Sequence, residues 1–373
     1  MEIKPITVFF GPNNSGKSVT ALTMYAMARL MLERSDVNSW SFIDQVPRYV
    51  TGIRRAGFSS LLGAMITQDK EMGEIRVTCA VKNREFDFTL EMRRTKPRMR
   101  RRDLSLTARP SLKQLNIALR RNKTDNKAEL NHLYVPAARA GILQAFYPLM
   151  YLKNTILTDL EGLAVRGGGY FEISRLPLML PHLEEFYDLL FRTLGDTDPA
   201  PVNHALNEVI GGEISIQRTE KSVIPTILYH DNSGFTTQLE TAGSGIIELL
   251  PLLIFLDKIQ PRGLLFVEEP EAHCEVRTQA KLIRLITRTC VSKKISSVLI
   301  THSDWVLYSL LSLVSQGELR RDQLAIYEFD RPEGMLTTVK EIEFDKRGKT
   351  EGLPPFEEVL STLEKADLGA ALR

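Results

Sequence analysis

The stretch from Ile6 to Ser18 constrains this chain more than any other, because an apolar run leads into a glycine-bracketed loop that ends in a Lys-Ser pair (ITVFFGPNNSGKS). The loop has the spacing G-x-x-x-x-G-K-[ST], which is typical of a phosphate-binding loop between a strand and a helix. Ile6–Phe10 favours a buried strand, and Val19–Leu32, rich in Ala, Leu and Met, favours a helix. An ordinary Gly/Asn-rich turn would explain the glycines but gives no reason for the Lys-Ser pair.

Each residue type in this loop has a task at a bound phosphate. Gly11 and Gly16 let the backbone approach closely, while N–H groups at the helix start face the anion. Lys17 would neutralise the outer phosphates, and the Ser18 hydroxyl would coordinate Mg2+. The predicted nucleotide contacts here are Gly11, Pro12, Asn13, Asn14, Ser15, Gly16, Lys17, Ser18 and Val19.

The charge of the chain is uneven along its length. The 373 residues carry a net charge of only +2, but the segment from Arg93 to Lys123 holds twelve Lys/Arg and one acid, Asp103. Such a run forms either a solvated loop or a patch that contacts nucleic-acid phosphates, independently of sequence and sensitively to salt. The nucleic-acid candidates are Arg93, Arg94, Lys96, Arg98, Arg100, Arg101 and Arg102.

The cellular setting predicted from composition is cytoplasmic. The three cysteines form no C-x-x-C pattern, which argues against a disulfide framework or a zinc site. The first residues show no signal-peptide pattern. The most apolar run, Ile246–Leu256, is shorter than the ~20 residues of a membrane span and contains Glu248 and Pro251.

Periodicity and turn residues predict an α/β chain with two lobes, residues 1–140 and residues 141–345, followed by a C-terminal helical tail, residues 346–373. The expected strands are a 73–92 hairpin broken at Lys82, a short strand in 130–141, strands in 213–218 and 222–238, buried strands at 263–267 and 295–301, and edge strands in 323–344. The expected helices lie in 141–194, 239–256, 275–291 and Pro355–Ala366. The strand-helix-strand order of 263–301 predicts a parallel unit.

Acidic residues and a histidine follow the two buried strands of that unit. Glu268 would hold Mg2+, and Glu269 would orient and deprotonate a water that attacks the γ-phosphate. His302 would contact the γ-phosphate or the nucleophile. The alternatives are an acidic helix start, a structural histidine, or a metal site of Glu268, Glu271 and His273, which no second His or Cys supports.

The order of four motifs, GPNNSGKS, TAGSG, LLFVEEPEAH and VLITHS, resembles the ABC-type head ATPases of the RecF, structural-maintenance-of-chromosomes (SMC) and OLD (overcoming-lysogenisation-defect) group. It is most similar to the prokaryotic stand-alone ATP-binding proteins of that group without a Toprim domain, as is YVPAARAG at 134–141. The resemblance implies a P-loop, ABC-ATPase-like two-lobed head with a mostly parallel core sheet and an antiparallel β subdomain.

The resemblance also assigns roles. It implies that Gly11 to Ser18 form the Walker A loop and that Glu268 is the Walker B acid. It implies a catalytic role for Glu269, His302 and Lys17, and it places Glu271 at the start of the D-loop. The signature segment would be Thr241, Gly243, Ser244 and Gly245, with its register left open between Thr241-Ala242-Gly243 and Gly243-Ser244-Gly245. His273-Cys274-Glu275 departs from the usual His-Leu-His-Pro run, and Gln144 and Arg139 are candidates for the Q-loop.

The implied function is an ATP-hydrolysing, Mg2+-dependent switch that forms a head-to-tail homodimer on ATP. It would engage DNA or an effector protein, in phage defence or genome maintenance, with no membrane partner. The alternatives are an OLD-like nuclease, a RecF-type DNA-repair protein and an adaptor that binds ATP without hydrolysis. A transporter ATPase is disfavoured because the signature is degenerate.

Overall fold

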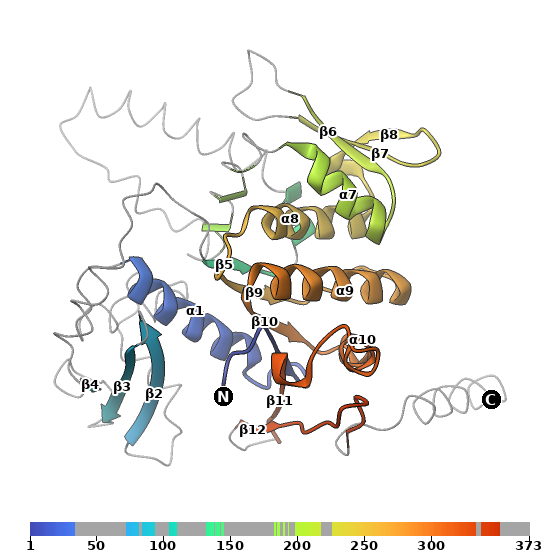
Figure 1. Cartoon of the computed structure of the whole chain (residues 1–373). Helices are drawn as coiled ribbons and strands as arrows, with labels where there is room; N and C mark the ends of the chain where they lie inside the picture. The colour runs from blue at the N-terminus through green and yellow to red at the C-terminus, as the bar shows by residue number, and fades with distance from the viewer. Residues whose placement is uncertain are drawn as a thin grey trace, which may run out of the picture. The chain divides into compact units, whose positions relative to one another are not determined.

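The computed structural model describes residues 1–33, 72–81, 84–93, 104–109, 132–137, 139–141, 143–144, 183, 185–186, 189–190, 193, 198–217, 226–332 and 337–350. The chain divides into two compact units. Figure 1 labels the helices and strands that are described below. The first unit comprises Met1–Lys17, Ala137–Ala140 and Thr193–Arg373, and the second comprises Ser18–Pro136 and Gly141–Arg192. The predicted division into two lobes, 1–140 and 141–345, and a tail, 346–373, remains a prediction.

Five strands of the first unit lie side by side in the large sheet, in the order β12-β11-β1-β10-β9. They are β1 (Ile6–Phe10), β9 (Leu264–Glu268), β10 (Ser296–Thr301), β11 (Leu324–Asp330) and β12 (Thr338–Glu341). β1 pairs in parallel with both β10 and β11, β10 pairs in parallel with β9, and β12 is antiparallel to β11. The predicted buried strands of β1, β9 and β10 are confirmed.

β11 corrects one expectation. The expectation of edge strands in 323–344 holds for the exposed β12 but is wrong for β11, because β11 lies between β12 and β1. Leu324, Ala325, Ile326 and Tyr327 are consecutive and all buried, so both faces of this strand are covered. Such a continuous apolar run is typical of an interior parallel strand.

The helices of the first unit follow from apolar stripes of different widths. They are α7 (Pro199–Val209), α8 (Ser244–Lys258), α9 (Val276–Lys293) and α10 (Asp304–Ser315), with 3-10 turns η3 (Leu239–Thr241) and η4 (Arg321–Gln323). Every residue of α8 from Ile247 to Leu256 is buried, whereas α9 buries one face and packs against α10 and α7. The sequence analysis did not predict α10.

A small antiparallel sheet completes the described part of the first unit. Its strands are β6 (Glu213–Gln217), β7 (Thr226–His230) and β8 (Thr236–Gln238). Asp231 fixes the turn between β7 and β8, because its Oδ1 accepts hydrogen bonds from the backbone N–H groups of Ser233 and Phe235, each at 2.8 Å. An aspartate at the start of a turn commonly bonds the backbone in this way.

The second unit contains α1, which begins at the junction of the units, and an antiparallel sheet. The elements are α1 (Lys17–Glu33), β2 (Met72–Val81), β3 (Arg84–Arg93), β4 (Leu104–Arg109) and β5 (His132–Val135). β2 and β3 form the predicted hairpin, and β4, within the basic segment, adds a third strand. Inside this unit the Tyr25 hydroxyl donates to Glu185 Oε2 at 3.2 Å, and the ring lies 5.3 Å from that of Tyr134.

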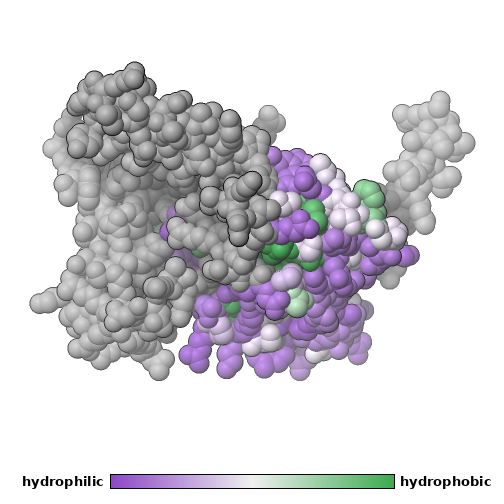
Figure 2. All heavy atoms as spheres, turned by 90° about the horizontal axis from the view of Figure 1, so that it is seen from above, coloured by the Kyte–Doolittle hydropathy of each residue, from purple (hydrophilic) through white to green (hydrophobic). Residues whose placement is uncertain are grey.

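The α/β class, with a mostly parallel core sheet and a separate antiparallel sheet, is confirmed. The predicted helix Pro355–Ala366 and most of 141–194 lie outside the described residues. No helix in the described ranges is both long and apolar enough to cross a bilayer. The face seen in Figure 2 is mostly hydrophilic where it is described, with small, scattered apolar patches.

Candidate functional site

The segments predicted to form the site follow three neighbouring strands, in the sheet order β1-β10-β9. The registers align the strand ends, since Phe10 pairs with Thr301 and Ile300 pairs with Glu268. Because the strands are parallel, their carboxyl ends meet at one edge, where ligands of open α/β sheets bind. The phosphate loop, the two glutamates and His302 therefore share one edge of the sheet.

Lys17 is a buried cation whose partners are neutral. Its Nζ donates to the carbonyl oxygens of Gly11 and Pro12, each at 2.7 Å, and Lys17 as a whole is 7% exposed. Within the described ranges, Nζ forms no ion pair with a carboxylate. Burial lowers the pKa of Lys17, and the charges of Glu269 and Glu271 oppose this shift. A desolvated ammonium bound only by neutral oxygens fits an anion as its missing partner.

The loop before Lys17 adopts a backbone that few residues allow. Gly11 has φ +142°, and a Cβ there would come within 2.0 Å of the Phe329 carbonyl oxygen. Gly16 has φ +94°, and Asn14, between them, has φ 62°. These left-handed positions turn the chain sharply between β1 and α1, which is why the motif requires glycine at its two ends.

Glu269 combines a fixed backbone with an open side chain. Its φ of 42° is unusual for a non-glycine residue, and its N–H donates to the Ile300 carbonyl at 2.8 Å. The side chain is 40% exposed, and Oε1 lies 3.6 Å from Nδ1 of His302, which is 49% exposed. Backbone strain of this kind persists only where neighbouring contacts hold it, and it clusters at functional sites.

Arg139 supplies those contacts. Its Nη1 donates to the Glu268 carbonyl at 2.8 Å and its Nη2 to the Glu269 carbonyl at 3.0 Å, so one guanidinium holds the backbone of both glutamates. Nε donates to the Glu248 carbonyl at 2.8 Å and lies 3.1 Å from Glu248 Oε2. The two side chains are 0% and 1% exposed. Desolvation lowers the pKa of Arg139, and the Glu248 carboxylate opposes that shift most strongly.

Glu248 completes this buried arrangement from helix α8. Its Oε2 accepts the backbone N–H of Arg139 and its Oε1 that of Ala140, both at 2.9 Å. The Arg139–Glu248 pair therefore connects α8, which starts in the signature-like segment, with the end of β9. The sequence analysis missed Glu248, although a signal was present: it is the one charged residue in the apolar run 246–256, and a buried charge requires a partner.

Glu271 is a second buried carboxyl, 6% exposed, three residues after Glu268. Its Oε1 accepts a hydrogen bond from the Thr301 hydroxyl, which in turn accepts the Ser303 N–H at 2.9 Å. Its Oε2 has no hydrogen-bond partner among the described residues. Burial raises the pKa of Glu271, and the Thr301 hydrogen bond partly offsets this. The pair connects the segment after β9 with the start of α10.

A cavity of about 520 Å³ opens beside these groups and is called the carboxylate pocket below. Its lining includes Glu269, Glu271, His302, His273 and Trp305. The histidine and glutamate side chains that meet there come from the ends of two neighbouring strands. The pocket therefore offers a place where an acceptor of protons and a water could meet. No three potential metal-ligating side chains cluster in the described part of the chain.

The signature-like segment lies at the surface of the first unit. Thr241, Gly243 and Ser244 are exposed, and Gly243 caps the amino end of α8. The Thr241 hydroxyl donates to the Gln238 carbonyl at 3.0 Å. A Cβ on Gly245 would come within 3.1 Å of the His273 carbonyl, so this glycine permits close packing next to the residues after β9. The exposed face of the segment is available to a second molecule.

The oxygen donors predicted for Mg2+ fit its coordination chemistry. Ser18 is exposed in the first turn of α1, and Glu268 is half-buried, with Oε2 accepting the Ala137 N–H at a long 3.3 Å. Mg2+ takes one or two protein oxygens together with phosphate oxygens and waters, so a dedicated cage of carboxylates is not required.

For two sets of predicted residues, the described structure gives no contacts that support the predicted role. Arg94, Lys96, Arg98, Arg100, Arg101 and Arg102 lie outside the described residues, and Arg93 is described only as the last residue of β3. Gln144 is exposed in the second unit, whereas Arg139, the other Q-loop candidate, has its guanidinium engaged by protein oxygens. The nucleic-acid assignment and the Q-loop stay predictions.

The chain resembles solved SMC heads in fold. It matches an SMC head bound to the C-winged helix domain of ScpA with a TM-score of 0.50 and 13% identity, covering 93% of each chain. It also matches a Pyrococcus furiosus Smc head with an extended coiled coil (TM-score 0.46, 12% identity, 97% and 93% covered) and the SMC head domain from Thermotoga maritima (0.44, 13%, 92% and 92%). At these identities the likeness shows the fold alone. No curated protein sequence matches the chain.

A sequence family also matches, over residues 84–307, which is more than half of the chain. The matched stretch includes Arg139, the signature-like segment, both glutamates and His302, and the phosphate loop precedes it. The family match therefore does not depend on the phosphate loop. The chain belongs to the family described as AAA domain, putative AbiEii toxin, Type IV TA system.

Proposed function

We propose that this protein is an ATP-hydrolysing switch, in which ATP binding joins two copies head to tail and the closure changes contact with DNA or an effector protein. The AAA family membership and the SMC-head fold support the nucleotide part of this proposal. Phage defence or genome maintenance is the proposed setting, and the toxin named in the family description is compatible with the first.

The observation that carries the proposal is the position of Lys17. Its buried ammonium donates only to carbonyl and hydroxyl oxygens, and the carboxylates whose charges affect its pKa are Glu269 and Glu271. A triphosphate in the loop would supply the absent negative charge through charge-assisted hydrogen bonds. The same placement would bring the outer phosphate towards the residues at the end of β9.

Hydrolysis then requires a proton acceptor and a group that orients water. Water would attack the γ-phosphorus, the bond to the ADP oxygen would break, and Glu269 would accept the proton released by the water. Because the Glu269 side chain is 40% exposed and its Oε1 lies 3.6 Å from His302 Nδ1, the histidine can orient the carboxylate towards the attacking water. Mg2+, held by Ser18 and Glu268, would neutralise phosphate charge.

The exposed signature-like segment supports the dimer part of the proposal. Thr241 and Ser244 offer hydroxyls, and the start of α8 offers backbone N–H groups and the positive end of a helix dipole. In a head-to-tail pair this segment would cap the nucleotide of the other copy. SMC heads are the fold relatives, and one of them is described in complex with ScpA. A partner of this chain is by analogy an effector protein.

The decisive experiment measures ATP turnover by the full chain with and without duplex DNA, and nuclease activity on the same samples. We expect turnover that DNA stimulates, with the DNA left intact. Lys17→Ala serves as the matched control, because it removes the phosphate-loop charge and should abolish ATP binding while the fold is kept.

Two results would contradict the proposal. Normal ATP affinity of Lys17→Ala would reject the loop as the nucleotide site. Metal-dependent DNA cleavage by the chain alone would replace the switch by the nuclease alternative. Turnover that is insensitive to DNA would remove DNA from the proposal and leave an effector protein as the partner.

A further inference from the structure

Both chain neighbours of His302 are held by hydrogen bonds, although the His302 side chain itself is 49% exposed. Thr301, which is 0% exposed, donates its hydroxyl proton to Glu271 Oε1 and accepts the Ser303 N–H at 2.9 Å. One buried hydroxyl therefore holds both the residue before His302 and the residue after it. Its acceptor, Glu271, belongs to the segment 269–275 that follows β9.

A second line of hydrogen bonds runs from the same loop to the same segment. The Ser303 hydroxyl donates to Gln279 Oε1 at 3.3 Å, and Gln279 Nε2 donates to the Cys274 carbonyl at 2.9 Å. The two lines meet at Ser303, one at its N–H group and the other at its hydroxyl. The four side chains that form them are called the histidine support below: Glu271, Gln279, Thr301 and Ser303.

Ser303 forgoes a local hydrogen bond in this arrangement. It is the N-cap residue of α10, where a serine side chain commonly accepts an N–H from the first turn of the helix. Its side chain makes no such capping bond, and its hydroxyl donates to Gln279 on α9 instead. A departure from local preference of this kind is expected at functional sites.

A purely structural contact would not require an acid at position 271. Glu271 is 6% exposed, and its Oε2 has no hydrogen-bond partner among the described residues, which is unfavourable for a buried polar atom. The same short segment contains two strained residues, with φ 42° at Glu269 and φ 57° at His273. Features of this kind persist only where the surroundings hold them, and they cluster at active sites.

The distance between His302 and Glu269 indicates what the support can control. Nδ1 of the histidine lies 3.6 Å from Oε1 of the glutamate, whereas a hydrogen bond between such atoms spans about 2.7–3.2 Å. A shift of the histidine by about 0.5 Å therefore decides whether this bond forms. Glu271, Gln279 and Ser303 line the carboxylate pocket together with the two side chains of this pair.

We propose that the histidine support positions His302 against Glu269 and thereby sets the rate of hydrolysis. Its members are positioning residues, since they act through His302 rather than on the nucleotide. This inference rests on the proposed ATP hydrolysis, and it adds Gln279, Thr301 and Ser303, to which the sequence motifs gave no role. When the support is disturbed, ATP should still bind, because the phosphate loop is unchanged, but hydrolysis should slow.

Steady-state kinetics of the full chain with Thr301→Val and Thr301→Ser test the first line of bonds. Valine keeps the shape of threonine but lacks the hydroxyl. The kcat should therefore fall about tenfold, as for a displacement of about half an ångström, while KM for ATP stays within about twofold of the wild type. Serine keeps the hydroxyl and should restore kcat to within about threefold of the wild type.

Ser303→Ala tests the second line at a half-buried position, where the substitution is compatible with folding. It removes the longer bond to Gln279 and leaves the Ser303 N–H bonded to Thr301, so kcat should fall only about threefold. Circular dichroism and ATP affinity should match the wild type in this variant and in Thr301→Val.

The decisive measurement repeats Thr301→Val in a His302→Gln background. A residue that acts only through His302 has nothing left to position there, so the second substitution should lower kcat by less than about twofold. General structural damage would instead lower kcat by the same factor in both backgrounds. The two readings therefore differ in the coupling of the two substitutions, which a stability measurement does not report.

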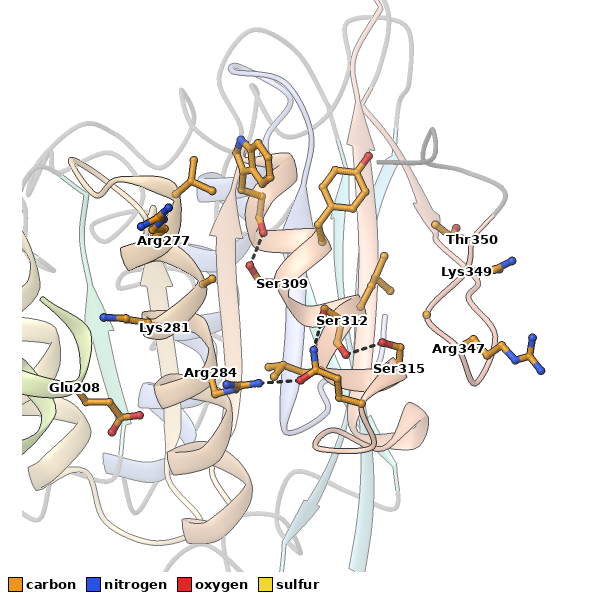
Figure 3. Close-up of a pocket in the computed structure, with 18 residues that line it drawn as sticks. Glu208, Arg277, Lys281, Arg284, Ser309, Ser312, Ser315, Arg347, Lys349 and Thr350 are labelled. Carbon is orange, nitrogen blue, oxygen red and sulfur yellow. Dashed lines mark hydrogen bonds between the residues drawn. The ribbon is translucent and has the colours of Figure 1, made fainter. Parts of the chain in front are cut away.

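Ser315→Ala is the matched control for Ser303→Ala, because it makes the same change at the other end of α10. The Ser315 hydroxyl donates to the Ser312 carbonyl at 2.8 Å, on a separate groove lined by α9 and α10 (Figure 3), so kcat should not change. Unchanged kcat of Thr301→Val, or an equal loss in both backgrounds, would overturn this inference and leave the proposed function intact. Absence of ATP turnover by the wild type would overturn the proposed function, and this inference with it.

Discussion

Two pairs of side chains meet at Glu269, Arg139 with Glu248 and Glu269 itself with His302, and they differ in burial and in distance. The Arg139–Glu248 pair is fully buried, with an N–O distance of 3.1 Å and further hydrogen bonds to the glutamate carbonyls. The Glu269–His302 pair is 40% and 49% exposed, with a longer 3.6 Å distance. The buried pair fixes where the backbone of Glu269 lies, while the open pair leaves its side chain able to respond to a ligand.

The difference teaches why one site needs both kinds of pair. A buried pair whose partner is removed leaves an uncompensated charge, which costs about 3–5 kcal/mol, whereas an exposed pair contributes about 0–1 kcal/mol. Burial thus gives a charge pair a structural role, and exposure lets its side chains move when a ligand binds. Substitutions in the two pairs should therefore separate stability from turnover.

The largest effect is expected for Arg139→Met. It leaves the Glu248 carboxylate buried without its cation and the Glu268 and Glu269 carbonyls without donors, so the free energy of unfolding should fall by about 3–5 kcal/mol. Urea unfolding followed by circular dichroism measures this. Arg284→Met breaks the exposed pair with Glu318 and should change stability by about 1 kcal/mol or less. Similar losses for the two variants would contradict the contrast between buried and open pairs.

Arg139→Lys sharpens the same point. A lysine keeps the charge but lacks the planar fork that reaches two carbonyls at once. We expect it to recover part of the stability lost in Arg139→Met, while turnover stays reduced because Glu269 is no longer held. Full recovery of turnover would show that only the charge matters, and not the contacts with the carbonyls.

Glu269→Gln should affect turnover and spare stability. The amide cannot accept a proton, so turnover should fall by about 10²- to 10³-fold, while unfolding changes by less than about 0.5 kcal/mol because the side chain is open. With ATP the variant should accumulate as a dimer in gel filtration with light scattering. A variant that remains monomeric with bound ATP would count against the head-to-tail arrangement.

A smaller effect on turnover is expected for His302→Gln. The amide keeps a hydrogen-bond donor near Glu269 but removes the ring, so turnover should fall by about 10- to 100-fold, less than for the loss of the proton acceptor itself. Stability should again be close to that of the wild type. Loss of ATP binding in this variant would indicate that His302 acts on nucleotide affinity rather than on the water.

The smallest effect concerns the pH dependence at Glu271. Burial raises the pKa of its carboxyl above 4.5, so the stability that protonation gives is complete below about pH 4.5 and is lost as the pH rises through the folded-state pKa. Glu271→Gln removes this loss. The variant should gain stability relative to the wild type as the pH rises from 4.5 to 8. Thermal unfolding at both pH values measures it, and a constant difference would disprove a titrating Glu271.

Local pattern was sufficient for much of the fold. The apolar runs of β1, β9 and β10 are too short and too continuous for anything but buried strands, and the hairpin of β2 and β3 shows alternation about a polar break. The position of β11 was not predictable in this way. Its neighbour β1 is set by contacts between residues more than three hundred positions apart, and periodicity carries no information about them.

The site residues likewise fall into those whose role the local sequence predicts and those whose partners it does not predict. The phosphate loop is encoded locally, since the glycines fix the turn and place Lys17, and the two glutamates are recognisable because carboxylates follow a buried strand. The partners of Arg139 were not predictable from its position, because a lone arginine after a short strand is compatible with many contacts. Glu248 is more than a hundred residues away from it and became its partner only through the packing of α8.

The sequence by itself determined which groups are the candidates to bind a phosphate and to accept a proton, because spacing within a few residues controls backbone conformation and the direction of side chains. Tertiary structure decided which of those groups are fixed and which stay open. Burial depends on what packs against a residue, and here it made Arg139–Glu248 a rigid support while it left Glu269 and His302 accessible to a ligand.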